Sequence, residues 1–372
     1  MADNPLKRLE SLGQSVWYDY IRRDLVEGGG LKRLIDEDCL RGMTSNPTIF
    51  EKAIAGSALY DQDIRSAAAG KPAAQIYEDL AVHDVRGAAD VFRQTYDARR
   101  GQDGFVSIEV QPHLARDTQG TIAEARRLWA ECARPNVMVK IPGTPEGLPA
   151  IRQCLSEGIN INITLLFSVQ RHREVMEAYL AALEDRVQAR KSVDGIASVA
   201  SFFVSRVDTN ADKKLDALIA KGNEKAKALR GKIAIANARL AYEAFEQVFR
   251  QPRFAALKAR GARVQRPLWA STSTKDPVYP DLYYVEALIA PDTVDTMPPE
   301  TFEAYRDHGD PKVRIHDDLE GARAALRQLA DLGISVEQVY KELEDEGVKK
   351  FSDSYDSLLK AIQQKAHSMR VA

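Results

Sequence analysis

One lysine lies inside an apolar stretch of the sequence. Lys140 stands between Val139 and Ile141 in VMVKIPG, and a Pro-Gly turn follows directly. Burying an unpaired charge among apolar groups is unfavourable by several kcal/mol, so this lysine needs a structural or a chemical reason. Burial also lowers the pKa of an amine, which makes it a nucleophile toward carbonyl carbon. The stretch therefore predicts either a lysine whose ammonium group reaches out of the fold or a lysine that forms a Schiff base.

Other apolar stretches carry isolated polar residues in the same way, close to their carboxyl ends. These residues are Asp19, Asn46, Glu109, Asn162, Thr164, Ser201, Arg206 and Ser271. Together with Lys140 they offer a nucleophile, carboxylates for proton transfer, amides, hydroxyls and a guanidinium group suited to a phosphate. An iminium group on a lysine accepts electrons, so a neighbouring C–C bond can break or form without a metal ion.

Each of these residues also has a structural interpretation. Asp19 and Glu109 suit ion pairs with arginines of neighbouring helices, and Asn46 before a proline suits a turn. Arg206 suits a surface cation, and Ser271 opens an STST run that suits a helix cap. The interpretation as one site therefore depends on the position that all these residues share.

Eight apolar stretches predict strands. They are residues 15–21, 41–47, 105–112, 136–143, 158–168, 196–208, 266–274 and 282–289. Helical patterns such as 121–132 and 169–190 separate them, which predicts a parallel sheet covered by helices. An α/β fold with a closed (β/α)8 TIM barrel is the first expectation, and a doubly wound open sheet is the second. In a barrel the carboxyl ends of the strands meet at one mouth, where the polar residues would form one site.

Two regions exceed what a minimal barrel needs. Residues 209–264 predict a helical insertion of two helices with a break near Gly222, and residues 318–370 predict two or three further helices. No Pro/Ser-rich linker separates either region from the rest. We therefore expect one domain over residues 1–372, with both regions as additions to the barrel.

The composition argues against several classes of protein. The 372 residues include 52 Lys and Arg against 54 Asp and Glu, and no long block of one sign occurs, so neither nucleic acid nor a membrane is expected as a partner. Three cysteines without CxxC spacing predict a reducing compartment. The N-terminal segment is charged and no long apolar stretch occurs, which predicts a cytoplasmic protein. A monomer and a homodimer both remain open.

The sequence contains no pattern that is typical of a metal or nucleotide site. Its six histidines show neither HxH nor HExxH spacing, and GxGxxG and GxxxxGK[ST] do not occur. We expect no metal ion and no cofactor.

With these residues identified, the chain resembles the transaldolases, in particular their long bacterial form. The most specific stretches are GMTSNPTIF, VMVKIPGTPEG, INITLLFS and LWASTSTKDP, and the similarity continues to DEGVKKFSDSYDSLL. The resemblance implies a circularly permuted (β/α)8 barrel of the class I aldolase type. It implies an enzyme of the non-oxidative pentose phosphate pathway that moves a dihydroxyacetone unit between sugar phosphates. Sedoheptulose 7-phosphate and glyceraldehyde 3-phosphate would give erythrose 4-phosphate and fructose 6-phosphate.

The resemblance also implies roles for matching positions. Lys140 matches the Schiff-base lysine, and Asp19 matches the acid/base at the C4 hydroxyl. Glu109 and Thr164 match the pair that handles water and protons while the carbinolamine forms. The substrate-binding positions are Asn46 and Asn162 for the dihydroxyacetone hydroxyls, and Ser201, Phe203, Arg206, Ser271 and Lys275 toward the phosphate.

One position departs from the short transaldolases, which have a second arginine where this chain has Ser273. Lys275 supplies a cation nearby, but as a point charge rather than a bidentate fork.

Two other functions compete with this interpretation. A free fructose 6-phosphate aldolase of the same superfamily would have a similar fold, but such relatives are shorter and tend to carry glutamine at Glu109 and tyrosine at Phe203. A non-catalytic barrel whose 209–264 insertion binds a protein partner would leave Lys140 dispensable.

Overall fold

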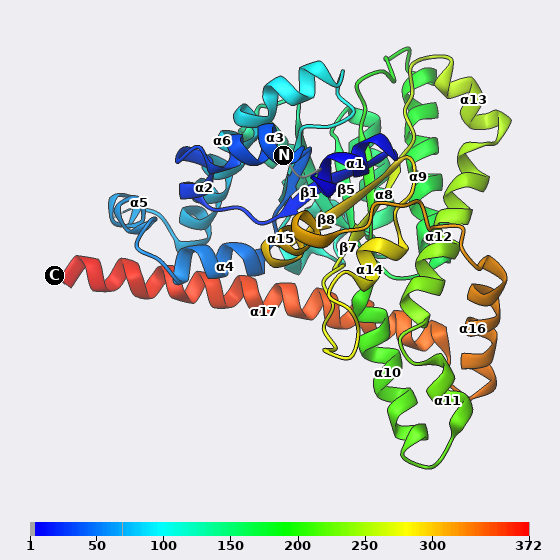
Figure 1. The fold of residues 1–372 in the computed structure, drawn as a ribbon. Coiled ribbons are helices and arrows are strands. Elements are labelled where there is room, and N and C mark those ends of the chain that lie inside the picture. Colours follow the sequence, from blue (N-terminus) through cyan, green and yellow to red (C-terminus); the bar gives the residue numbers. More distant parts are fainter. Residues whose placement is uncertain (1–3, 69, 372) are drawn as a thin grey trace.

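Eight parallel strands form a closed barrel in the order β1 to β8 (Figure 1). The computed structural model describes residues 4–68 and 70–371. The strands are β1 (Gln14–Asp19), β2 (Gly42–Thr44), β3 (Phe105–Glu109), β4 (Val137–Pro142), β5 (Ile161–Leu166), β6 (Ser198–Phe203), β7 (Arg266–Ala270) and β8 (Thr293–Met297). Pairing of β1 with β8 closes the ring, so the predicted (β/α)8 barrel is confirmed and the open sheet is excluded.

The predicted eighth strand at 282–289 is wrong. Tyr283–Ala287 forms the short helix α14, and the chain reaches the barrel only later, in β8. Tyr284 and Val285 made the earlier stretch look like a strand, but they are buried helix residues. Periodicity alone does not separate a short buried helix from a short buried strand.

Helices on the outside of the barrel precede β1 or follow a strand along the chain. They are α1 (Pro5–Ser11), α2 (Arg23–Glu27), α3 (Gly30–Asp38), α4 (Pro47–Ala55), α5 (Asp61–Ala67), α6 (Ala73–Ala98), α7 (Thr118–Cys132), α8 (Gly147–Glu157), α9 (Val169–Gln188) and α15 (Pro299–His308), with the 3-10 turn η1 (Pro112–Leu114). Every residue of β3, β4, β5 and β6 is buried, because helices cover one face and the barrel interior lies on the other.

The region of the predicted insertion is helical but holds more helices than expected. It contains α10 (Ser205–Ile219), α11 (Glu224–Leu229), α12 (Ile233–Phe249) and α13 (Pro252–Lys258). The break near Gly222 is the turn between α10 and α11, where Gly222 has a φ of +83°. Gly231 makes a second turn with a φ of +75°, which the Ala- and Lys-rich composition did not reveal.

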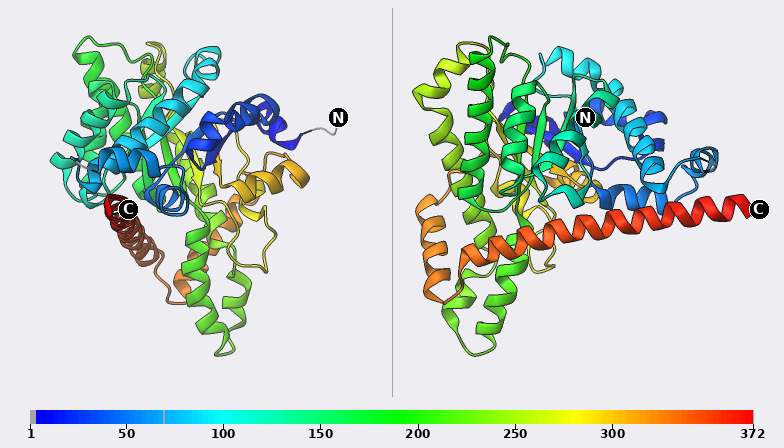
Figure 2. Two further views of the ribbon diagram at one scale, coloured as in Figure 1. Left: turned by 90° about the vertical axis from the view of Figure 1, so that its left-hand side faces the viewer. Right: turned by 180° about the vertical axis from the view of Figure 1, so that it is seen from behind.

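The last two helices are α16 (Leu319–Asp331) and α17 (Val336–Val371). α17 packs against α4, α5, α6 and α10, and so runs across one end of the barrel (Figures 1 and 2). The contact places a segment from the end of the sequence beside residues 47–67. Across residues 4–68 and 70–371, no helix has the length and apolar character needed to cross a bilayer.

Candidate active site

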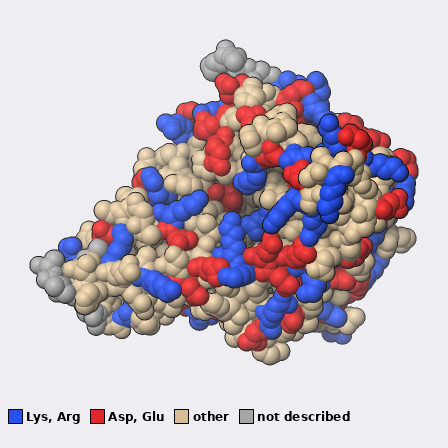
Figure 3. Space-filling model, turned by 90° about the horizontal axis from the view of Figure 1, so that it is seen from below, with Lys and Arg blue, Asp and Glu red and all other residues tan. Residues whose placement is uncertain are grey.

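A pocket of about 380 Å³ opens at the carboxyl ends of the barrel strands. Most of the predicted site residues line it: Asp19, Asn46, Lys140, Ser201, Phe203, Arg206, Ser271 and Lys275. The remaining three, Glu109, Asn162 and Thr164, are buried in β3 and β5. Figure 3 shows a hollow on the face that α17 crosses, with Lys and Arg side chains around it and acidic side chains inside.

Lys140 lies in β4 with its side chain inside the barrel. It pairs in register with Glu109 on β3 and with Asn162 on β5, and such neighbours point to the same face of a sheet. Its Nζ lies 3.5 Å from Glu109 Oε2 and donates to the Ser45 carbonyl oxygen at 3.2 Å. The side chain is only 6% exposed, so this lysine does not reach out of the fold.

Glu109 and Thr164 bring buried polar atoms with unused hydrogen-bonding capacity. Within the described part of the chain, neither carboxyl oxygen of Glu109 has a hydrogen-bond partner. The Thr164 hydroxyl has none there either. Burial raises the pKa of Glu109 to about 7, although Lys140 acts in the opposite direction. A buried, weakly satisfied carboxyl group close to a buried amine is typical of a proton-transfer site.

Asp19 ends β1 and is held by the neighbouring strand. Thr44 Oγ1 donates to Asp19 Oδ1 at 2.7 Å and lies 2.7 Å from Thr296 Oγ1. Burial raises the pKa of Asp19, while the charge of Lys140 and the Thr44 hydrogen bond lower it. The carboxyl group is therefore fixed in orientation while it lines the pocket.

The two asparagines are held in different ways. Ser201 donates to Asn162 Oδ1 at 2.7 Å, and Asn162 Nδ2 donates to Ser107 Oγ at 3.0 Å, which fixes the amide inside the barrel. Asn46 Oδ1 accepts from the Ile49 backbone N–H at 3.0 Å and so caps α4. Instead of making the predicted turn, Asn46 caps a helix, and it also lines the pocket.

Unpaired cations surround the outer part of the pocket. Arg206 begins α10 and lies 5.0 Å from the centre of the Phe203 ring, while Lys275 donates to Ser273 Oγ. Lys52 of α4 and Lys350 of α17 line the same pocket. Within residues 4–68 and 70–371, none of these four cations forms an ion pair with a carboxylate.

The repulsion among these cations contributes to the lowered pKa values of Lys275 and Lys350. Burial lowers the pKa of Lys275, with Arg206 and Lys52 adding to the shift and Glu300 opposing it. Burial also lowers the pKa of Lys350, to which Arg206, Lys275 and Lys52 contribute. Asp19 and Glu300 also line the pocket, but like charges gathered without an ion-pair contact to a described carboxylate favour an anionic ligand.

Ser271 follows β7 with its backbone in the left-handed region, at a φ of +56°. Its Oγ lies 3.0 Å from Ser205 Oγ, and its carbonyl oxygen accepts from the Ser205 N–H at 3.0 Å. A non-glycine residue in this region needs support from its surroundings, and such residues are concentrated at functional sites.

Comparison with known proteins decides the family. Residues 16–362 match the transaldolase/fructose-6-phosphate aldolase family. The chain belongs to this family. The transaldolase of Trichodesmium erythraeum is 45% identical over 377 residues, which cover 99% of each chain. The transaldolase of Thermobifida fusca is 50% identical over 365 residues, covering 97% of this chain and 98% of its own length. A protein named Transaldolase 2 from Nostoc punctiforme is 47% identical over 98% of both chains.

Some residues of this transaldolase-family pocket were not predicted. Lys52, Lys350 and Phe351 lie on helices, and the Phe351 ring is 5.9 Å from Lys140 Nζ. Lys350 belongs to DEGVKKF, one of the stretches that carried the resemblance, but a lysine pair on a helix looks like a solvated surface. Thr44 of β2 was not predicted either, although it stands in GMTSNPTIF, another of the stretches that carried the resemblance.

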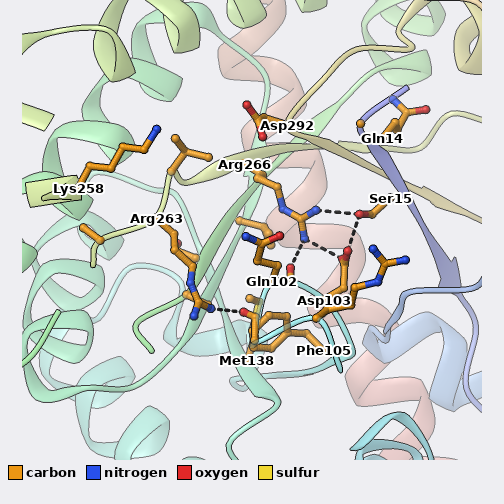
Figure 4. Close-up of a pocket in the computed structure, with 18 of the residues that line it drawn as sticks. Gln14, Ser15, Gln102, Asp103, Phe105, Met138, Lys258, Arg263, Arg266 and Asp292 are labelled. Atoms are coloured by element: carbon orange, nitrogen blue, oxygen red, sulfur yellow. Dashed lines mark hydrogen bonds and ion pairs between the residues drawn. The ribbon is translucent and has the colours of Figure 1, made fainter. Parts of the chain in front are cut away.

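A second pocket, of about 410 Å³, lies at the opposite end of the barrel (Figure 4). Arg266 donates there to Ser15 Oγ at 2.8 Å, to Asp103 Oδ1 at 2.9 Å and to the Gln102 carbonyl oxygen at 2.7 Å. Arg263 donates to the Arg100 carbonyl oxygen at 2.6 Å. No predicted site residue lines this pocket, and its two central arginines are satisfied by the protein.

Metal ligands do not gather anywhere in the described residues. No three His, Cys, Asp or Glu side chains there come together as a possible metal site.

Proposed function

We propose that the chain is a transaldolase that uses Lys140 as its Schiff-base nucleophile. The observation that carries the proposal is the buried Lys140 amine, 3.5 Å from Glu109, at the base of a pocket bordered by unpaired cations. The substrates are sugar phosphates, and a dihydroxyacetone unit passes from sedoheptulose 7-phosphate to glyceraldehyde 3-phosphate. The products are erythrose 4-phosphate and fructose 6-phosphate.

The first stage is formation of the iminium. The Lys140 amine adds to the C2 carbonyl of the ketose phosphate, and the carbinolamine then loses water. Glu109 and Thr164 exchange protons with the carbinolamine oxygen and with this water. Support comes from their unsatisfied buried oxygens and from the Glu109 pKa of about 7, which permits a carboxyl group to act as base and as acid near neutrality.

The second stage is exchange of the aldose. Asp19 accepts the proton of the C4 hydroxyl, the C3–C4 bond breaks, and its electrons pass into the iminium to give an enamine. The first aldose phosphate leaves, and the enamine carbon attacks the aldehyde of the second. Asp19 then returns its proton to the new hydroxyl, and water hydrolyses the iminium. The position of Asp19 in the pocket and its hydrogen bond from Thr44 support this role.

The substrate is held at both ends. Asn46 and Asn162 bind the dihydroxyacetone hydroxyls, and the fixed amide of Asn162 supports its part. Arg206, Ser271 and Lys275 bind the phosphate, with Ser201 and Phe203 lining the path between. Lys52 and Lys350 add charge at the phosphate end, which supplies the cation that Ser273 cannot.

Trapping of the iminium tests the nucleophile. Borohydride reduction in the presence of fructose 6-phosphate should add a dihydroxyacetone-derived mass to the peptide that contains Lys140, and Lys140→Met should remove the label. Label on another lysine, or none on the native chain, would contradict the proposal.

A second measurement separates a transaldolase from a free fructose 6-phosphate aldolase. Turnover of fructose 6-phosphate should rise strongly when erythrose 4-phosphate is added as acceptor. Equal rates with and without the acceptor would favour the free aldolase.

We also propose that the chain forms one domain and acts in the cytoplasm. Packing of α12 against α9 and of α17 against α4 supports the single domain, because both added regions rest on helices of the barrel. The free thiols of Cys39, Cys132 and Cys154 support a reducing compartment.

A further inference from the structure

We propose that Arg230 and Tyr279 are positioning residues for Lys275, and that holding the loop of this lysine is a task of helices α10 to α12. The inference rests on the proposed function, because it assumes that Lys275 meets a substrate phosphate. It gives the helical region at 209–264 a part in substrate binding, although Arg230 and Tyr279 do not line the pocket.

The loop concerned connects β7 with α14 and comprises residues 271–282. Its first half carries Ser271, Ser273 and Lys275, all of which line the pocket. The start of the loop is fixed, because Thr272 donates to Asp295 Oδ1 at 2.8 Å and Ser271 contacts Ser205. The tip is open to solvent, with Val278 75% exposed. Lys275 lies between the fixed start and the exposed tip.

Arg230 holds the loop directly after Lys275. Its Nη2 donates to Asp276 Oδ2 at 2.7 Å, and its Nη1 donates to the Tyr279 hydroxyl at 2.7 Å. Its Nε donates to Asp216 Oδ1 of α10 at 2.8 Å. The guanidinium group thus joins α10 to two loop residues, and Asp276 is the neighbour of Lys275 in sequence.

Tyr279 makes the second connection. Its hydroxyl accepts from Arg230 and donates to Asp212 Oδ2 at 2.8 Å, while Asp212 Oδ1 accepts from the Gly231 N–H at 2.9 Å. Gly231 has to be glycine for two reasons. Its φ is +75°, and a Cβ there would lie 2.6 Å from Cζ of the Tyr279 ring. The turn between α11 and α12 is therefore shaped to receive the loop.

A lysine depends on such support more than an arginine does. A guanidinium group binds a phosphate as a fork and fixes its own geometry, whereas an ammonium group on a flexible stem is a point charge. The backbone that carries Lys275 must then be placed by other contacts, and Arg230 and Tyr279 supply them.

A double-mutant cycle tests the inference. We compare Arg230→Met, Lys275→Met and the double variant in kcat and KM for fructose 6-phosphate with erythrose 4-phosphate as acceptor. Arg230→Met should raise KM about tenfold with little change in kcat, the effect of one hydrogen bond to a charged group. The double variant should be no worse than Lys275→Met alone, because both changes act through the same ammonium group.

Two controls keep the test specific. Arg250→Met removes an exposed arginine that pairs with Glu246 on α12, and KM should not change. Trapping of Lys140 with dihydroxyacetone, which has no phosphate, should be equal in the native chain and in Arg230→Met. If Arg230→Met does not fold, Tyr279→Phe removes only the connecting hydroxyl and should raise KM in the same direction.

The inference fails if KM is unchanged in the folded variant that is measured, if the effects of Arg230→Met and Lys275→Met add, or if dihydroxyacetone trapping is lost together with phosphate binding. These results differ from failure of the proposed function, which would appear as absence of label on Lys140 in the native chain.

Discussion

The two ends of the barrel hold pockets of similar size. They differ in whether the charged side chains of the pocket have partners within the protein. At the amino-terminal end, Arg266 is bonded to Asp103, Ser15 and the Gln102 carbonyl oxygen. At the carboxyl-terminal end, Arg206 has no ion pair with a described residue. Glu109 lies 3.5 Å from Lys140 Nζ, but neither of its oxygens has a hydrogen-bond partner among the described residues. Each pocket is lined by at least one arginine and by carboxylates, so the residue types alone do not distinguish the two pockets.

The difference lies in whether the protein satisfies its own polar groups. A satisfied buried ion pair fixes the structure, and breaking it is strongly destabilising because one charge is left alone. An unsatisfied buried group is unfavourable for folding and is retained where a ligand or a reaction uses it. We therefore expect substitutions at the two ends to separate stability from activity.

The largest effect is expected from Glu109→Gln at the carboxyl-terminal end. We expect kcat/KM to fall about 10²- to 10³-fold, the range of a lost general acid–base group. In the native chain kcat/KM should rise with pH through about 7, where the Glu109 carboxyl ionises and becomes a base, and glutamine should remove this rise. The measurement is the pH profile of kcat/KM.

The free energy of unfolding should not fall with the activity in Glu109→Gln. The pKa of this carboxyl is raised from 4.5 to about 7 in the folded chain, so the folded state binds the proton more tightly than the unfolded state. The stabilisation that the protonated Glu109 carboxyl gives to the folded state is present below about pH 4.5 and is lost as pH rises through about 7. Glutamine should therefore not lower the unfolding free energy at pH 8, and a large loss would contradict the comparison.

Arg266→Met at the amino-terminal end should give the reverse result. We expect the free energy of unfolding to fall by about 2–3 kcal/mol, because the substitution leaves the buried Asp103 carboxylate without its cation, although Ser15 and Trp17 still donate to it. Both kcat and KM should stay at native values at temperatures where the variant is folded. Denaturant titration and steady-state kinetics measure the two quantities.

The matched control is Lys258→Met in the same pocket. Lys258 is exposed and has no ion pair among the described residues, so the unfolding free energy should change by less than about 0.5 kcal/mol. Loss of activity in folded Arg266→Met would show that this end of the barrel takes part in catalysis.

The smallest of the three effects is expected from Arg206→Leu. KM for sugar phosphates should rise about tenfold, the loss of one charge-assisted contact to phosphate. The unfolding free energy should not fall, because the guanidinium group has no carboxylate partner and its removal relieves repulsion from Lys275 and Lys350. A destabilised variant with native KM would place Arg206 among the structural residues.

The sequence was sufficient to predict where the strand residues of the candidate site lie. Lys140 and Glu109 are polar residues inside apolar stretches, and two-residue spacing put Asn162 and Thr164 on one face. These local patterns arise from the burial of strands, so they can be recognised in the sequence without knowing which distant segments are in contact. β8 was not predicted because its sequence, TVDTM, is short and mixes polar with apolar residues.

Local sequence patterns did not predict the residues that long-range packing brings to the candidate site. Lys52 and Lys350 are ordinary helix lysines in sequence. Lys52 borders the pocket from α4, and Lys350 borders it because α17 packs across α4. The connection from Arg230 to Tyr279 joins positions 49 residues apart, in regions that look like solvated helix and loop. Neither residue type nor spacing marks such a pair.

The position of α17 at the end of the sequence also means that part of the pocket lining is synthesised last. β1 closes the ring only when β8 has been synthesised, and Lys350 and Phe351 emerge from the ribosome after β8. A nascent chain can therefore contain every barrel strand and still lack Lys350 and Phe351, which line the pocket. The lining of the pocket is therefore complete only after α17 has been synthesised and packs against α4.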